Sequence, residues 1–194
     1  MLMEIEYALI EKCMKDNREA QEKLYYILYA PLIRVGMRYY VNENDSIAAM
    51  HNAYLKILDK LHLFRYNKSF MNWAKRIMIN TILDEFRKKK LSNGYQKELT
   101  LNTYPAEDAE LMNDVEKTIE KQHVMELLSI LPEATRVVFN LYVFEGYTHK
   151  DIGKSLKISE NTSKWHLSNG RIKLKAFLEA NNYFDQSLLK IKIS

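Results

Sequence analysis

Basic, amide and hydroxyl side chains share a segment with helical spacing at residues 146–174, GYTHKDIGKSLKISENTSKWHLSNGRIKL. Ile152 and Leu156 fall on one face of a short first helix, and Ser159 is a suitable N-cap for a second helix. Steps of four, three and four residues mark the inward face of that second helix at Ser163, Leu167, Gly170 and Leu174. This pattern predicts a helix-turn-helix, whose second helix enters the major groove of DNA.

The opposite face of the second helix follows from a rotation of 100° per residue, and it carries polar side chains. Lysine can reach guanine acceptors in the major groove, and serine can donate or accept there. An outward indole, Trp165, also favours a ligand, because exposed large apolar groups often mark interaction sites. The alternative is a helix pair whose charged face is only solvated. We predict that Asn161, Trp165 and Ser168 face outward, flanked by Lys164 and Asn169.

A second concentration of basic side chains lies between residues 65 and 90, and aromatic residues are interleaved with it. This composition is typical of a groove that follows a single nucleic-acid strand and stacks its bases. The alternative is that the rings belong to the core and that the lysine run is a solvated helix end. Helical spacing places one group of side chains on a common face, namely Asn72, Arg76, Asn80, Leu83 and Arg87.

The elements that position these side chains are predicted to be helices, because helical spacing recurs almost throughout and alternation is absent. Pro31 is expected to kink or divide the second helix, and Ser69 to cap the fourth. The expected helices span residues 4–15, 19–41, 46–61, 69–90, 115–128, 132–145, 148–156 and 160–178. Periodicity fades between the two groups of four, which indicates a linker.

Composition agrees with a folded, helix-rich protein, with 47% apolar and 28% charged residues, 5 Gly and 3 Pro. The net charge of +4 weakly favours an anionic partner. The single cysteine, Cys13, cannot form an internal disulfide, which favours a reducing cytoplasm. The amino-terminal residues do not resemble a secretion signal, and no apolar run reaches bilayer length. We therefore expect a soluble, cytoplasmic protein without membrane insertion.

Two stretches resemble the extracytoplasmic-function (ECF) group of the sigma-70 family. The stretch FMNWAKRIMINTILDEFRKKK, residues 70–90, is similar to the family's order of Trp, Arg-Ile, Asn and Asp ahead of a basic helix end. The stretch LPEATRVVFNLYVFEGYTHKDIGKSLKISENTSK, residues 131–164, is similar to the family's region 4. The resemblance implies an all-α fold of two small helical domains joined by a flexible linker. It implies region 2 at 1–90, a linker at 91–113, region 4 at 114–182 and a C-terminal tail at 183–194.

The resemblance also implies roles for individual residues. Asn80 and the loop 64–70 would capture a flipped base of the minus-10 element, and Arg76, Arg87 and Lys88 would hold phosphates. The full minus-10 set is Phe64, Arg65, Lys68, Phe70, Trp73, Arg76, Asn80, Arg87 and Lys88. At the minus-35 element, Lys164, Trp165 and Ser168 would face bases, while Thr162, His166, Asn169 and Arg171 would face the backbone. The surface for polymerase docking would comprise Asp45, Ala49, His51, Asn52 and Lys56.

Two departures from the family pattern change the expected chemistry. Residues 48–52, Ala-Ala-Met-His-Asn, replace the usual acidic pair, apolar residues and Gln-Glu of the polymerase dock, and Asp45 and Asp59 are the carboxylates that can compensate. Trp165 and His166 replace the commoner Ser-Arg, which implies an unusual minus-35 preference.

An enzyme is not supported, because the five histidines show no metal-ligand spacing and no Gly-rich phosphate loop is present. We expect no metal, no cofactor and no catalytic residues. The resemblance predicts a sigma factor that directs RNA polymerase core enzyme to promoter DNA and assists promoter opening, with an anti-sigma factor as a further partner. The alternative is a helix-turn-helix regulator that never joins polymerase. Such regulators usually carry a mixed α/β domain, and residues 1–90 show no strand pattern.

Overall fold

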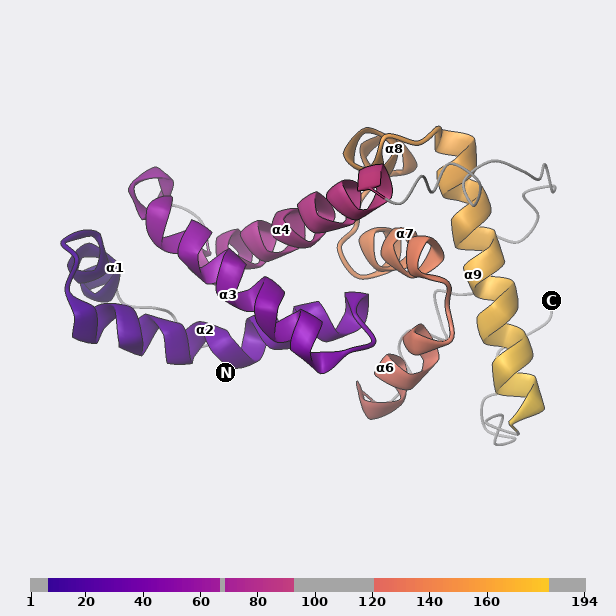
Figure 1. The fold of residues 1–194 in the computed structure, drawn as a ribbon, viewed down its shortest axis with the longest axis horizontal. Coiled ribbons are helices and arrows are strands. Elements are labelled where there is room, and N and C mark those ends of the chain that lie inside the picture. Colours follow the sequence, from indigo (N-terminus) through magenta and orange to yellow (C-terminus); the bar gives the residue numbers. More distant parts are fainter. Residues whose placement is uncertain (1–6, 67–68, 93–120, 182–194) are drawn as a thin grey trace. The chain divides into compact units, whose positions relative to one another are not determined.

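The computed structural model describes residues 7–66, 69–92 and 121–181, and every regular element in these ranges is a helix. The chain divides into two compact units, Met1–Ser92 and Asn93–Ser194, each described by itself below (Figure 1). The predicted all-α class is therefore confirmed for the described residues. The expected linker 91–113, apart from its first two residues, and the expected tail 183–194 lie outside these ranges.

The first unit is built from three long helices that pack on one another: α2 (Arg18–Tyr39), α3 (Glu43–Asp59) and α4 (Phe70–Ser92). A shorter helix, α1 (Tyr7–Met14), packs on α2 and on the 3-10 turn η1 (Leu61–Leu63). The centre of this core consists of fully buried side chains, namely Leu24, Leu28, Leu32, Met50, Ile57, Met78 and Ile82. Burial of these apolar groups is what holds the three helices together.

Local signals start α2 and α4 within one residue of the expected positions, whereas α3 starts three residues before the expected position 46. The Asn17 side chain accepts a hydrogen bond from Ala20 N (2.8 Å), and Ser69 Oγ accepts one from Asn72 N (3.4 Å). Of the two effects expected from Pro31, a kink or a division, the division does not occur, because α2 continues through Pro31 to Tyr39. Leu28 and Leu32 on either side of the proline are fully buried, and this packing outweighs the loss of one backbone hydrogen bond.

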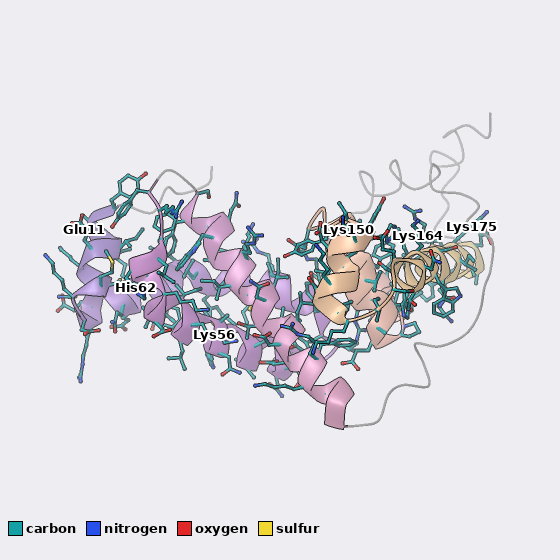
Figure 2. All side chains as sticks on the ribbon, turned by 90° about the horizontal axis from the view of Figure 1, so that it is seen from above. Glu11, Lys56, His62, Lys150, Lys164 and Lys175 are labelled. Atoms are coloured by element: carbon teal, nitrogen blue, oxygen red, sulfur yellow. The ribbon has the colours of Figure 1, made fainter. Side chains whose placement is uncertain are left out.

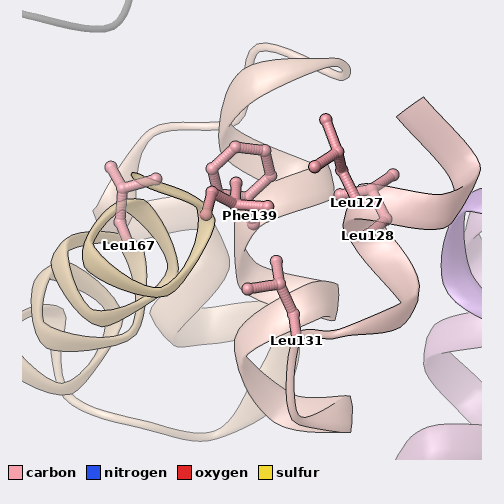
Figure 3. Close-up of a cluster of buried hydrophobic side chains, with 6 residues drawn as sticks. Leu127, Leu128, Leu131, Phe139 and Leu167 are labelled. Carbon is pink, nitrogen blue, oxygen red and sulfur yellow. The ribbon is translucent and has the colours of Figure 1, made fainter. Parts of the chain in front are cut away.

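The second unit consists of α6 (Lys121–Ser129), α7 (Glu133–Val143), α8 (His149–Leu156) and α9 (Glu160–Ala180). In this unit α9 packs on both α7 and α8. Figure 3 shows the core between α6, α7 and α9, formed by Leu127, Leu128, Leu131, Phe139, Leu167 and Leu174. Leu167 and Leu174 are the residues that α9 contributes to this core.

The turns of the second unit follow the sequence signals. Gly146 after α7 has a positive φ of 69°, a conformation that glycine adopts without strain. Thr148 Oγ1 accepts a hydrogen bond from Asp151 N (3.1 Å), which is the side-chain cap expected of the predicted capping box. Ser159 Oγ accepts one from Thr162 N (3.0 Å) at the start of α9, which confirms the predicted cap. Within the described ranges, no helix has both the length and the apolar character needed to cross a bilayer.

Candidate nucleic-acid interfaces

The helix-turn-helix predicted at residues 146–174 is present as α8, a tight turn and α9. Lys157 adopts the left-handed conformation (φ 55°), and Ile158 N donates to Gly153 O (3.1 Å). A Cβ atom on Gly153 would lie 2.9 Å from the carbonyl oxygen of Ile158, closer than normal packing allows. The backbone of the turn therefore lies directly against α8, and this contact sets the direction in which α9 leaves the turn.

The inward face of α9 is the predicted one. Ser163, Leu167, Gly170 and Leu174 are all buried. Gly170 permits a close approach to α7, because a Cβ there would lie 3.1 Å from Thr135 Cγ2 and 3.3 Å from Phe139 Cδ2.

The outward face of α9 is accessible at most of the predicted positions. Lys164 is exposed, and Lys150 of α8 in the same unit is exposed as well (Figure 2). The partly exposed members of the predicted set are Thr162, Trp165, Ser168, Asn169 and Arg171. Accessibility is what base and phosphate contacts require, and the contacts themselves stay predictions.

His166 is the exception, and the prediction that it faces the DNA backbone is wrong. Its side chain is only 2% exposed, and Nδ1 hydrogen-bonds to Oγ1 of Thr135 on α7 (3.0 Å). The Trp165 ring packs edge-on against the imidazole, with centroids 4.9 Å apart and an interplanar angle of 73°. A buried polar atom is stable when a partner satisfies it, and the hydroxyl of Thr135 does so for Nδ1 of His166.

A second histidine, His149, lies at the start of α8, between the two helices of the motif. Its Nδ1 atom hydrogen-bonds to Ser163 Oγ (2.9 Å), and its ring stacks on Tyr142 at 4.6 Å. Burial lowers the pKa of His149 below its usual 6.5, and the positive charges of Lys164 and Arg171 lower the pKa further, against a smaller opposite effect of Glu160. The imidazole is therefore mainly neutral at pH 7.

In the first unit, the aromatic residues around the loop 64–70 form a cluster. Phe64 and Phe70 are 7% and 6% exposed, and their ring centroids lie 5.0 Å apart. Trp73 packs 5.4 Å from each of them and is partly exposed. Phe64 and Phe70 therefore pack mainly against other aromatic rings, and direct contact of these two rings with DNA stays a prediction that their burial does not favour.

One contact of this loop was not anticipated from the sequence. Tyr7 Oη, on α1, donates a hydrogen bond to the backbone oxygen of Tyr66 (3.0 Å), and the two rings meet edge to face. Nothing in the local sequence signals a contact between residues 59 positions apart. The predicted contact residue Lys68 lies outside the described residues.

The polar face of α4 is narrower than predicted. Arg76, Asn80 and Lys88 are exposed, as is Arg65 in the loop before the helix. Leu83, which helical spacing placed on the same face, is 3% exposed and belongs to the core.

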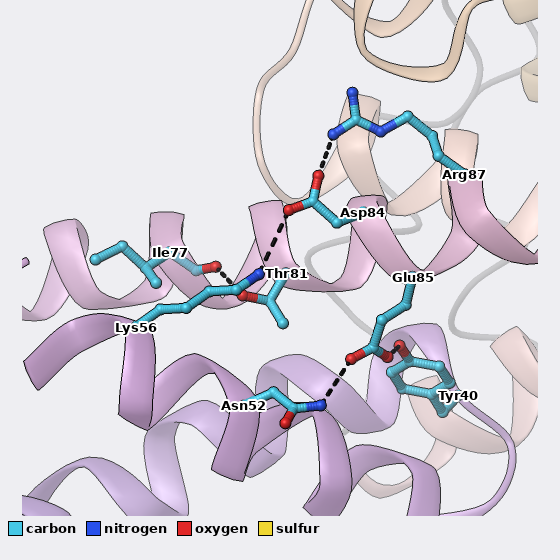
Figure 4. A network of polar contacts seen from close by, with 8 residues as sticks. All are labelled: Tyr40, Asn52, Lys56, Ile77, Thr81, Asp84, Glu85 and Arg87. Atoms are coloured by element: carbon cyan, nitrogen blue, oxygen red, sulfur yellow. Dashed lines mark hydrogen bonds and ion pairs between the residues drawn. The ribbon is translucent and has the colours of Figure 1, made fainter. Parts of the chain in front are cut away.

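Arg87, the remaining predicted phosphate contact, is partly exposed and forms an ion pair with Asp84 (Figure 4). Asp84 also accepts a hydrogen bond from Lys56 Nζ of α3 (3.4 Å). One carboxylate therefore connects a residue predicted to dock polymerase with a residue predicted to hold a phosphate. Both pairs are well exposed, so we expect each to contribute only about 0.2–1 kcal/mol.

The predicted docking surface on α3 is only partly accessible. Asp45, His51 and Asn52 are exposed, whereas Ala49 is 0% exposed and cannot contact a partner, so its assignment is wrong. His51 Nε2 is hydrogen-bonded to Tyr25 Oη of α2 (2.9 Å).

Carboxylates from α4 lie beside this surface, and the sequence interpretation did not include them. Glu85 accepts hydrogen bonds from Asn52 Nδ2 (3.1 Å) and from Tyr40 Oη (2.7 Å), as Figure 4 shows. Asp84 and Glu85 thus bring carboxylates to the side of α3 that carries Asn52 and Lys56. Among the described residues, no group of three or more His, Cys, Asp or Glu side chains could hold a metal ion.

Comparison with known proteins gives matches in both units. A family model described as Sigma-70 region 2 matches residues 24–91, and one described as Sigma-70, region 4 matches residues 121–174. The chain is similar to the ECF RNA polymerase sigma factor SigX of Bacillus subtilis, with 24% identity over 142 residues, 71% of this chain and 73% of the relative. It is also similar to the RNA polymerase sigma factor SigZ of the same species, with 32% identity over 111 residues, 56% and 58% of the two chains.

Among solved structures, the chain is similar to the sigma factor RpoE in complex with the anti-sigma factor NepR from Bartonella quintana. The TM-score is 0.47 and the identity is 16%, over 84% of this chain and 98% of that chain. The two family models fall on different units of the fold, one on each.

Proposed function

Because the chain belongs to the extracytoplasmic-function group of the sigma-70 family, we propose which of its surfaces perform each step of a sigma factor's work. As a sigma factor it directs RNA polymerase to promoters and takes part in transcription initiation. The observation that carries this conclusion is the presence of region 2 and region 4, in that order, on two separate helical units of one chain.

The outward face of α9 reads the minus-35 element in the major groove. Lys164 and Ser168 supply a cationic donor and a hydroxyl to base edges, and Trp165 supplies an apolar surface. Thr162, Asn169 and Arg171 flank them and contact phosphates, which fix the position of the helix without reading sequence. Support comes from the accessibility of all six side chains and from the close contact between the turn and α8.

The face of α4 holds the non-template strand of the minus-10 element after the strands separate. Asn80 is exposed near the middle of the helix, and its amide offers a donor and an acceptor to a flipped base. Arg65, Arg76, Arg87 and Lys88 neutralise phosphates. Trp73 is the one aromatic side chain of the predicted set among the described residues that keeps an accessible surface for stacking.

The polymerase docks on α3 at Asp45, His51, Asn52 and Lys56. The carboxylates of Asp84 and Glu85 on α4 lie beside this surface and take the place of the acidic residues that α3 lacks. Through these hydrogen bonds, the docking helix and the helix that holds DNA share one polar network.

Two further assignments rest on the family. An anti-sigma protein is a partner that holds the factor inactive, and the protein works in the cytoplasm, where polymerase and chromosome are located. Co-purification of the tagged chain from its native host tests for the two expected partners, RNA polymerase and the anti-sigma protein. Polymerase subunits and the inhibitor would each be recovered and identified.

Reconstituted transcription tests the function as a whole. The purified chain is added to core polymerase that lacks any other sigma factor, and run-off products are sequenced from a fragmented genomic template. We expect initiation at a small set of related sites, absent with core enzyme alone or with the chain alone. A helix-turn-helix regulator that does not join polymerase would bind DNA without core enzyme and give no transcript with it.

A further inference from the structure

We propose that Thr135 and His166 form a positioning pair that holds Trp165 in the orientation in which it reads a base. This inference rests on the proposed role of α9 at the minus-35 element and adds a specificity-determining contact that lies away from the DNA. His166 would thereby influence sequence preference from inside the protein instead of touching a phosphate.

The inner half of the arrangement is a two-point contact between α7 and α9. Thr135 is 1% exposed, and its Oγ1 atom hydrogen-bonds to His166 Nδ1 (3.0 Å). A Cβ atom on Gly170 would lie only 3.1 Å from the methyl carbon of Thr135, Cγ2. His166 and Gly170 are one helical turn apart, so a single threonine fixes both the rotation of α9 and its position along the axis.

The outer half of the arrangement is the contact between the imidazole and the indole. The Trp165 ring meets the His166 ring edge to face at 4.9 Å, a favourable geometry for aromatic pairs. Trp165 is partly exposed, so this buried neighbour limits the rotamers that the indole can adopt. The hydroxyl of Thr135 orients the imidazole, and the imidazole in turn supports the indole.

Fixed orientation matters for base discrimination more than for binding in general. An indole that is free to rotate contacts any base with similar energy, whereas a fixed one favours the base that fits its position. Sites of recognition generally need side chains whose rotamers are locked by packing and by hydrogen bonds behind them. Loss of the pair should therefore flatten the preference at positions that Trp165 reads and leave phosphate contacts unchanged.

Two substitutions of Thr135 separate the hydroxyl from the methyl group. Thr135→Val keeps the branched volume against Gly170 and removes the hydrogen bond, while Thr135→Ser keeps the hydroxyl and removes the methyl. Each variant is combined with core polymerase, and bound sequences are selected from a promoter library randomised at minus-35. Trp165→Ala in the same selection identifies the positions that depend on the indole.

We expect Thr135→Val to reduce base preference at those positions about three- to tenfold, the effect of losing one buried hydrogen bond. Thr135→Ser should retain the preference, even where its melting temperature is the lower of the two. The proposal is overturned if Thr135→Val keeps the preference. It is also overturned if both variants lose preference in proportion to their loss of thermal stability, because that result describes a purely structural residue.

If Thr135→Val folds poorly, a second variant and a spectroscopic measurement still test the proposal. His166→Asn keeps a hydrogen-bonding group near the position of Nδ1 but removes the ring beneath Trp165, so it should flatten the same positions. In a Trp73→Phe background, Trp165 is the sole tryptophan of the chain, and its fluorescence reports contact with the imidazole without DNA. Unchanged emission in both His166→Asn and Thr135→Val would refute the contact.

The two failures are distinguishable. Selection of any preferred sequence by the unmodified chain with core polymerase tests the proposed function. The difference between the valine and serine variants, together with the fluorescence of the free protein, tests the positioning pair.

Discussion

Substitution of Asn80 by alanine should impair promoter opening while leaving duplex binding intact. Asn80 is exposed on α4, and its side chain makes no hydrogen bond with any other described residue. Alanine has the higher helix propensity, by up to about 0.7 kcal/mol, so the stability of the first unit should not fall. Any loss of activity then reflects a lost contact with DNA.

The size of the loss follows from the contact that an amide makes with a base. A well-placed pair of hydrogen bonds contributes about 1 to 3 kcal/mol of discrimination, which corresponds to roughly a 5- to 150-fold change. Because a flipped base is available only after strand separation, this loss should appear on a template with a preformed bubble and not on a closed duplex.

The assay compares affinities of the polymerase complex for closed duplex and for bubble templates, together with permanganate reactivity of unpaired thymines. Asn44→Ala is the matched control, because Asn44 is an exposed asparagine on α3 outside every predicted contact. Equal losses on the duplex and on the bubble would refute the base-capture role. Equal losses in Asn44→Ala would show that removal of any surface amide has this effect.

Three further predictions concern the second unit. Lys164→Ala should remove about 1 to 3 kcal/mol of base discrimination at one minus-35 position, measured as binding free energies for a series of single base changes. An equal loss of affinity for every sequence would instead identify Lys164 as a phosphate contact. Gly153→Ala should lower the free energy of unfolding by on the order of 1 kcal/mol, because overpacking against the Ile158 carbonyl, about 1 to 3 kcal/mol, exceeds the helix-propensity gain of about 1 kcal/mol. An unchanged urea midpoint would contradict this. The pKa of His149 is lowered in the folded state, so below about pH 6.5 the unfolded chain binds more protons than the folded chain. The free energy of unfolding therefore decreases as the pH decreases through this range. Between about pH 7.5 and about pH 5.5, the urea midpoint of the unmodified chain should therefore decrease more than that of His149→Gln. An equal decrease in both proteins would exclude His149 as the cause.

The caps and turns of the second unit could be predicted because both partners of each contact lie close together in the sequence. Thr148 and Asp151 are three residues apart, as are Ser159 and Thr162. Contacts of this kind depend on local backbone geometry, which residue type alone largely determines. The inward face of α9 was predictable for a related reason, since its periodicity reflects one continuous contact with the rest of the unit.

The docking surface on α3 was less predictable because the number of neighbours cannot be derived from one helix. α3 packs on both α2 and α4, so the buried arc of the helix is wide. Ala49 lies within that arc and carries no strong hydrophobic signal of its own. The carboxylates of Asp84 and Glu85 were missed because they reach α3 from another helix.

His166 shows most clearly where sequence reasoning fails. Trp165 was expected on the outward face and is partly exposed, whereas His166, expected to face the DNA backbone, is buried. A polar group is buried at low cost only where another group satisfies it, and that partner, Thr135, lies 31 residues away on α7. The orientation of this part of α9 is therefore decided by α7, and a change at Thr135 can alter the base-reading surface without changing any residue on it.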